Sequence, residues 1–182
     1  MQRYPTTIQL PITHLCNFDC VMCGMRHMVN RQDFSAEELS IILQDKLFSQ
    51  VRYIGVNGGE PFLKPDITQC IMAMIHECQK LREINIISNG FYTTKIMDCL
   101  SSIRAICDER KISVNIAISL DGIGDMQDFH RGKEGAYQKA TETIRQLVEH
   151  KLADSIQCIC TITKYNIYRI NEVEEWSKYR LK

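Results

Sequence analysis

Residues 113–122 have the sequence Ser-Val-Asn-Ile-Ala-Ile-Ser-Leu-Asp-Gly, and their alternating pattern decides between the possible sheet architectures. Successive side chains of a strand point to opposite faces. One predicted face is apolar and consists of Val114, Ile116, Ile118 and Leu120. The other becomes polar toward its end and consists of Asn115, Ala117, Ser119 and Asp121. A strand covered by helices on both faces would be apolar on both, so the polar face indicates a barrel-like interior that holds a polar ligand.

Similar strand-like runs alternate with helix-like segments at intervals of roughly 35 residues, the size of a βα unit. The predicted strands cover residues 6–13, 52–57, 83–88, 113–119 and 155–163. Repeated strand–helix units favour parallel strands joined by right-handed crossovers. The predicted fold class is therefore α/β, a partial (β/α) barrel of parallel strands with at least five βα units.

The helices between the strands are predicted from apolar residues that recur every three or four positions. Four stripes have this spacing: Leu39, Ile42, Leu43 and Leu47; Ile67, Ile71, Met74, Ile75 and Cys78; Ile96, Leu100, Ile103 and Cys107; and Ala140, Ile144, Leu147 and Val148. Ser35 and Glu38 form a capping box before the first helix, with Phe34 and Leu39 as a hydrophobic staple. A fifth helix is predicted to begin near Asn171.

The composition is that of an ordinary globular domain. The chain has 182 residues, which suffice for one domain with its own core. Lys+Arg and Asp+Glu each number 22, so the formal net charge is zero. Because nucleic-acid binding usually needs a basic stripe, no nucleic-acid partner is predicted. No apolar run has the length of a membrane span or the form of a signal peptide, so the sequence predicts no membrane partner and a cytoplasmic protein.

Four of the predicted strands are followed directly by unusual residues. A cysteine cluster follows the first strand, and Asn57-Gly58-Gly59-Glu60-Pro61 follows the second. Ser88-Asn89-Gly90 ends the third strand, and Ser119-Leu120-Asp121-Gly122 ends the fourth. The C-terminal ends of parallel strands are where α/β folds carry their sites. The sequence therefore predicts one functional site built from all four segments.

The cysteine cluster has the spacing C-x3-C-x2-C at Cys16, Cys20 and Cys23. Three thiolates in one loop can surround one metal centre, and soft thiolates select zinc or iron–sulfur clusters. A zinc site needs four ligands, and His14 or His27 would have to complete the set. A cubane cluster with three protein ligands instead leaves one iron open to a cofactor or substrate. A zinc knuckle remains the alternative.

The other six of the nine cysteines are predicted to be structural. The odd count and a reducing compartment argue against disulfides. Four lie on or beside helical apolar stripes, where free cysteine behaves as a small hydrophobe: Cys70, Cys78, Cys99 and Cys107. Cys158 and Cys160 share one face of the fifth predicted strand and are expected to pack under helices.

With these motifs the chain resembles the radical S-adenosylmethionine (SAM) superfamily, from about Ile8 to its end. The three-cysteine spacing after the first strand is the family signature, and Gly58-Gly59-Glu60-Pro61 matches its GGE motif. Ser119-Leu120-Asp121-Gly122 and His130-Arg131-Gly132 resemble the branch that often carries a C-terminal SPASM or twitch domain. Peptide-modifying and sulfatase-maturing enzymes belong to that branch.

The resemblance implies a radical SAM enzyme of oxidoreductase or maturase type. Cys16, Cys20 and Cys23 would hold a 4Fe-4S cluster whose open iron chelates the amino and carboxylate groups of S-adenosylmethionine. An electron from a donor such as flavodoxin or ferredoxin would cleave the sulfonium C–S bond to a 5′-deoxyadenosyl radical. That radical would abstract hydrogen from a peptide, protein or small-molecule substrate, so the hard chemistry belongs to the cofactor.

The resemblance also implies residues that contact S-adenosylmethionine: Gly58, Gly59, Glu60, Asn89, Ser119, Asp121 and Arg131. The glycines would let the backbone approach the ligand, and Glu60 would accept a hydrogen bond from its ammonium group. Ser119 and Asp121 suit ribose hydroxyls, and a guanidinium such as Arg131 can clamp the methionine carboxylate. The alternative interpretation of the strand-end motifs is that they form ordinary turns, in which Gly, Ser, Asn and Asp are common. The alternative for Arg131 is a surface arginine.

The sequence departs from the family pattern in two places. Met22 stands before the third cysteine, where the family usually has an aromatic residue that contacts adenine, although a thioether can also contact a ring. The family core continues through a sixth strand and helix, so residues 1–182 are expected to form a radical SAM core domain that is short at its C-terminus. The alternative functions are a truncated member that binds without turnover and a non-catalytic iron–sulfur or zinc module.

Overall fold

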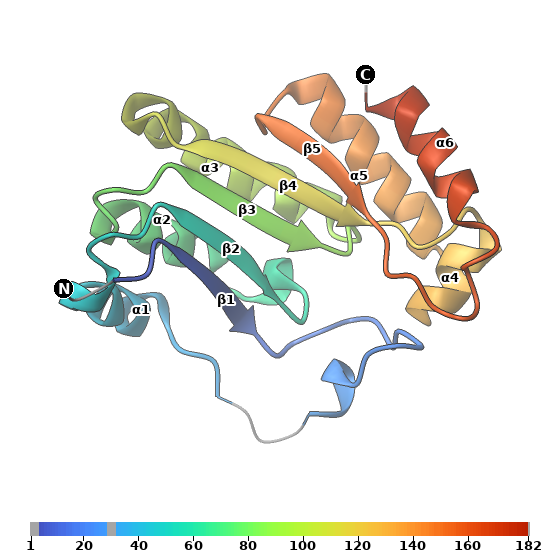
Figure 1. Ribbon diagram of the computed structural model, residues 1–182, viewed down its shortest axis with the longest axis horizontal. Helices are drawn as coiled ribbons and strands as arrows, with labels where there is room; N and C mark the ends of the chain where they lie inside the picture. Colours follow the sequence, from blue (N-terminus) through green and yellow to red (C-terminus); the bar gives the residue numbers. More distant parts are fainter. Residues whose placement is uncertain (1–3, 29–31, 182) are drawn as a thin grey trace.

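The computed structural model describes residues 4–28 and 32–181 of the chain. Within these ranges one sheet contains β1 (Thr7–Thr13), β2 (Tyr53–Gly58), β3 (Glu83–Ser88), β4 (Ser113–Ser119) and β5 (Ser155–Ile159). The strands lie in the order β1-β2-β3-β4-β5, and each neighbouring pair is parallel. This confirms the predicted α/β fold with parallel strands in a partial barrel. Figure 1 shows all five strands ending at the same edge.

The same ranges contain the helices α1 (Ala36–Leu43), α2 (Ile67–Glu77), α3 (Thr93–Arg110), α4 (Asp125–Arg131), α5 (Ala136–His150) and α6 (Ile170–Arg180). Three short 3₁₀ turns are η1 (Met25–His27), η2 (Lys46–Phe48) and η3 (Pro61–Leu63). Figure 1 shows α2 and α3 behind the strands, on one face of the sheet. None of the helices in the described ranges is long and apolar enough to cross a membrane.

The core confirms the predicted division of β4 into two faces. The side chains of Val114, Ile116 and Ile118 are fully buried, and β4 contacts both α3 and α5. On the other face, Ser119 and Asp121 are buried at the end that carries the site. The four cysteines predicted to be core residues are all buried: Cys70, Cys78, Cys99 and Cys107.

The capping box before α1 is confirmed, but the helix ends earlier than its apolar stripe predicts. Glu38 N donates to Ser35 Oγ at 3.2 Å, and Ser35 N donates to Glu38 Oε2 at 2.8 Å. Leu47, predicted to lie on the stripe, falls in η2 and is exposed. The reason is local, because Asp45 Oδ1 accepts from Leu47 N at 2.7 Å and caps a separate turn.

β5 is shorter than predicted, since it ends at Ile159 rather than at residue 163. Two backbone amides that would extend the strand donate to side chains instead. Thr161 N donates to Asp121 Oδ1, and Thr163 N donates to Asn166 Oδ1, both at 2.7 Å. The alternating pattern continues past Ile159, but side-chain acceptors replace the sheet as hydrogen-bond partners.

Candidate functional site

The segments that follow the strands surround one cavity of about 230 Å³. Its lining consists of Cys16, Phe18, Cys20, Met22, Cys23, Met25, Asn57, Gly58, Gly59, Ile87, Ser88, Asn89, Ser119, Arg131 and Thr161. Most of the predicted site residues therefore meet at this cavity. Glu60 and Asp121 are described but do not border it, and both side chains are buried behind the lining.

The cysteine loop, residues 16–23, is held by backbone contacts with other loops. Cys23 N donates to Cys20 O at 3.0 Å, which forms a turn between the last two thiols. Val21 N donates to His130 O at 3.0 Å, and Asn89 Nδ2 donates to Asn17 Oδ1 at 2.8 Å. The loop is therefore attached both to the end of β3 and to the end of α4.

The environments of the thiols differ. Burial raises the pKa of the Cys16 thiol, and burial also raises the pKa of the Cys20 thiol. The Arg131 guanidinium, 3.9 Å from Cys20 Sγ, opposes that rise at Cys20. Metal ligation requires the thiolate form, so Arg131 favours the state in which Cys20 can act as a ligand. Among residues 4–28 and 32–181, no three His, Cys, Asp or Glu side chains lie close enough together to hold one metal ion.

Two glycines allow the cysteine loop to lie this close to its neighbours. A Cβ atom on Gly59 would stand 2.1 Å from Leu15 O, and one on Gly132 would stand 2.1 Å from Asp19 O. Real side chains do not approach a backbone oxygen so closely. The sequence predicts that Gly59 allows approach to a ligand; the approach seen here is to the chain that leads into Cys16.

Glu60 connects the end of β2 to the end of β3. Its carboxylate accepts from Asn89 N at 2.7 Å, from Ser88 Oγ at 2.9 Å and from Phe62 N at 3.2 Å. The side chain is 1% exposed, and burial raises the pKa of Glu60 to about 7 against its ordinary 4.5. Glu60 thus fixes Asn89 beside the cavity, in addition to any contact with a ligand.

The raised pKa of Glu60 predicts a pH-dependent stability. The folded protein binds this proton more tightly than the unfolded chain, so the stabilisation is present below the ordinary pKa of 4.5 and is lost as pH rises through about 7. Between about pH 5 and pH 8 the contribution of Glu60 to the free energy of unfolding should fall by roughly 2–3 kcal/mol. Urea titrations of the wild type and Glu60→Gln should therefore diverge with pH, and parallel curves would contradict the prediction.

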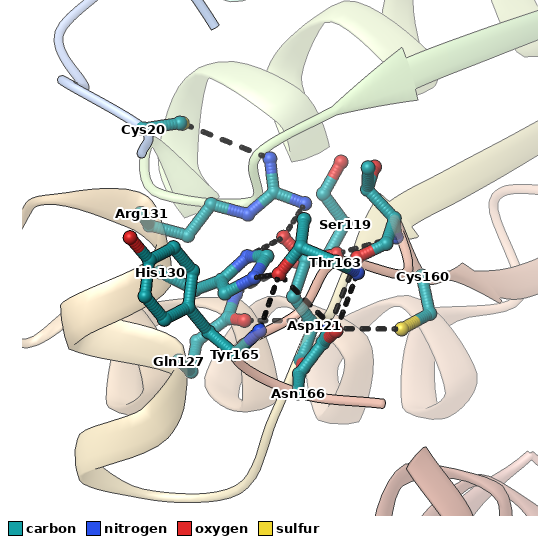
Figure 2. Close-up of polar contacts among 11 residues, drawn as sticks. Cys20, Ser119, Asp121, Gln127, His130, Arg131, Cys160, Thr163, Tyr165 and Asn166 are labelled. Atoms are coloured by element: carbon teal, nitrogen blue, oxygen red, sulfur yellow. Dashed lines mark hydrogen bonds and ion pairs between the residues drawn. The ribbon is translucent and has the colours of Figure 1, made fainter. Parts of the chain in front are cut away.

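Asp121 is completely buried and has three internal donors (Figure 2). Its Oδ2 atom lies 2.7 Å from Arg131 Nη2 and 3.0 Å from His130 Nδ1. Its Oδ1 atom accepts from Thr161 N at 2.7 Å. Since a carboxylate only accepts hydrogen bonds, Nδ1 of His130 carries the donated proton. Figure 2 shows Arg131 extended between Asp121 and Cys20.

Asn166, which the site prediction omits, joins the loop after β5 to the end of β4. Its Nδ2 atom donates to Asp121 O at 2.9 Å and to Thr161 O at 3.0 Å, and it lies 3.8 Å from Cys160 Sγ. Cys160 thus lies beside the polar network rather than under a helix, because β5 ends before it. Cys158 packs against the core as predicted. Asn166 lies three residues beyond the fifth predicted strand, whereas the predicted site takes in the segments after only the first four.

The donor set of the cavity fits an anionic cofactor group and a thiolate-bound cluster. The three cysteine thiols border one space from one loop. The Nε–H group of Arg131 is buried and has no hydrogen-bond partner in the described part of the chain. An unpaired buried donor is costly unless a ligand satisfies it.

The chain matches the Radical SAM superfamily over residues 10–176, and it belongs to that superfamily. The superfamily consists of enzymes whose characteristic cofactors are a 4Fe-4S cluster and S-adenosylmethionine. The match therefore confirms the resemblance drawn from the cysteine spacing and the GGE motif.

Among individual proteins, the chain is similar to the sporulation killing factor maturation protein SkfB of Bacillus subtilis. The two are 23% identical over 173 residues, which cover 94% of this chain and 39% of SkfB. A probable GTP 3′,8-cyclase of Sulfurisphaera tokodaii is 31% identical over 84 residues, covering 46% of this chain and 26% of the cyclase.

Two crystal structures of Streptococcus suis SuiB have a similar fold. The structure bound to S-adenosylmethionine has a TM-score of 0.72 at 17% identity, covering 97% of this chain and 39% of SuiB. The structure bound to the precursor peptide SuiA has a TM-score of 0.71 at 17% identity, covering 97% and 37%. At this identity the likeness shows the fold. The chain spans about two fifths of the length of SkfB and SuiB.

Proposed function

We propose that this chain is the core of a radical SAM enzyme that binds a 4Fe-4S cluster through Cys16, Cys20 and Cys23 and S-adenosylmethionine in the adjoining cavity. The observation that carries the proposal is the meeting of these three thiols with Gly59 and Arg131 around one space. A bare metal module has no need of the polar lining from the ends of β2, β3 and β4. When bound, the cluster and S-adenosylmethionine supply a radical that abstracts hydrogen from a substrate.

The residues of the chain would orient and shield these groups. Arg131 borders the cavity, and its guanidinium can bind a carboxylate in bidentate fashion. Ser119 and Asn89 border the cavity and offer polar groups to the rest of the cofactor. Phe18 and Met22 border it from the cysteine loop and exclude water from one side. Residues 1–182 are proposed to form one radical SAM core domain.

A peptide is the substrate class that we propose. SuiB binds a precursor peptide and SkfB is a maturation protein, and both match nearly the whole of this chain. GTP 3′,8-cyclases, which are named for a small molecule, match less of it: the one from Sulfurisphaera tokodaii covers 46% of this chain and one from Pasteurella multocida covers 79%. An electron donor such as flavodoxin or ferredoxin, a cytoplasmic location, and the lack of nucleic-acid and membrane partners stay predictions.

Anaerobic reconstitution with iron and sulfide tests the proposed function. We expect a cubane-type electron paramagnetic resonance signal from the reduced protein, a shift of that signal on addition of S-adenosylmethionine, and formation of 5′-deoxyadenosine. A signal that ignores S-adenosylmethionine would instead support a structural or electron-transfer module. Bound zinc without iron would support the zinc knuckle, and binding without 5′-deoxyadenosine would support a member without turnover.

A further inference from the structure

Arg131 is the one guanidinium that borders the cavity in the described part of the chain, and its position depends on Asp121. The Arg131 side chain is 11% exposed and the Asp121 side chain is 0% exposed, so the ion pair is largely shielded from water. The carboxylate contacts Arg131 through Nη2 at 2.7 Å. The Nε–H group of Arg131 remains without a partner among the described residues.

We propose that Asp121 is a positioning residue that holds Arg131 for the carboxylate of S-adenosylmethionine and does not itself contact that cofactor. The inference rests on the proposed function. It adds that the Asp121 carboxylate sets the orientation in which Arg131 binds a ligand carboxylate. Three donors already occupy the Asp121 carboxylate, from Arg131, His130 and Thr161. The side chain also lies behind the residues that line the cavity.

The surrounding contacts restrain the Asp121 side chain from several directions. His130 Nδ1 lies 3.0 Å from the same oxygen as Arg131, and His130 Nε2 lies 2.7 Å from Thr163 Oγ1. Asn166 binds the backbone oxygen of Asp121, and Gln127 Oε1 accepts from Asp121 N at 2.7 Å. A carboxylate with so many fixed contacts has little freedom to turn toward a ligand. It is well suited to hold a neighbouring cation in one orientation.

This arrangement predicts an effect that depends on the ligand carboxylate. In Asp121→Asn the amide nitrogen would face either Thr161 N or both Arg131 and His130, so in each orientation a donor meets a donor, and the negative charge that holds Arg131 is lost. Arg131 would then lose its fixed orientation, although its charge remains. Affinity for a ligand that carries a carboxylate should fall, whereas affinity for a ligand that lacks one should not.

The experiment compares S-adenosylmethionine with decarboxylated S-adenosylmethionine, which retains the sulfonium, the ammonium and the nucleoside. Equilibrium dialysis against the anaerobically reconstituted protein gives the two Kd values. Their ratio measures recognition of the carboxylate by the open iron and by Arg131 together, and its change between variants isolates the part that depends on Arg131. In Asp121→Asn this ratio should fall by about tenfold or more, as it should in Arg131→Gln. In the double variant it should fall no further. Asp125→Asn, an exposed aspartate on α4, is the matched control and should keep the wild-type ratio.

Other outcomes separate the inference from the proposed function. Equal weakening of both ligands by Asp121→Asn would show direct contact with the ribose or ammonium and would overturn the inference, as would unchanged binding. Wild-type protein that binds iron but neither ligand would contradict the proposed function, and the inference with it.

If Asp121→Asn loses its cluster, His130→Gln provides the second variant. It leaves the Asp121–Arg131 pair in place but removes one restraint, so a smaller fall in the same ratio is expected, and no change in the ratio would overturn the inference.

Discussion

Replacement of Cys20 by alanine is expected to abolish assembly of the iron–sulfur cluster. Iron and sulfide should fall from about four of each per chain to nearly none after reconstitution. Cys20 is the middle one of the three proposed ligands, and its thiol borders the cavity beside Arg131. Two remaining thiolates cannot hold a cubane that already relies on only three protein ligands. Chemical iron and sulfide analysis, with the visible absorption of the protein, measures the loss.

Cys158→Ala is the matched control for loss of a thiol. Cys158 is half-buried on β5 and packs against the core, away from the cavity lining. Its replacement should lower the free energy of unfolding slightly, because a small buried hydrophobe is lost, and leave iron and sulfide at wild-type values. A full cluster in Cys20→Ala would refute the assignment of the ligands, and so would a lost cluster in a folded Cys158→Ala.

Replacement of Gly132 by alanine should prevent the cysteine loop from docking, although no thiol is changed. The new Cβ atom would meet Asp19 O, and Gly132 has a φ of 59°, in the left-handed region. Overpacking costs about 1–3 kcal/mol, and the left-handed conformation adds about 1 kcal/mol. We expect the free energy of unfolding to fall by about 2–4 kcal/mol, with a large loss of bound iron.

Gly135→Ala separates the two causes, because Gly135 also has a positive φ, 74°, but a Cβ atom added there would meet nothing within 4 Å. This variant should lose only about 1 kcal/mol and keep its cluster. Urea denaturation and iron analysis of both variants give the comparison. Equal losses of iron in the two would show that backbone strain, and not the contact with Asp19, is responsible.

The regular elements could be predicted where local pattern and tertiary contacts agree. The limits of β3 and β4 match the expectation, since both strands are central and their hydrogen bonds go to neighbouring strands. β5 is shorter than expected because Asp121 and Asn166 compete for its backbone amides. Nothing in the alternation of residues 155–163 reveals acceptors that lie elsewhere in the chain.

The sequence predicts which segments form the site, but not the contacts between their side chains. Motif spacing brings the cysteines, Gly59 and Arg131 to one edge of the sheet, and the structure places them around one cavity. The burial of Asp121 and the approach of Gly132 to Asp19 depend on how α4 packs against the cysteine loop. Cys20 and Arg131 lie 111 positions apart, a separation at which sequence pattern carries no information on contact.

The order of the strands in the sheet, which is also their order in the chain, has a consequence for synthesis on the ribosome. Each new strand can pair with the one made just before it, so the sheet can grow as the chain emerges. The cysteine loop emerges before the segments that carry Arg131 and Asn166. At ordinary translation rates of about 5–20 residues per second, this interval is roughly 6 to 30 seconds. Until Arg131 has been made, Cys20 lacks its guanidinium neighbour and the cavity around the three thiols is incomplete, so we expect the cluster to be loaded after that point.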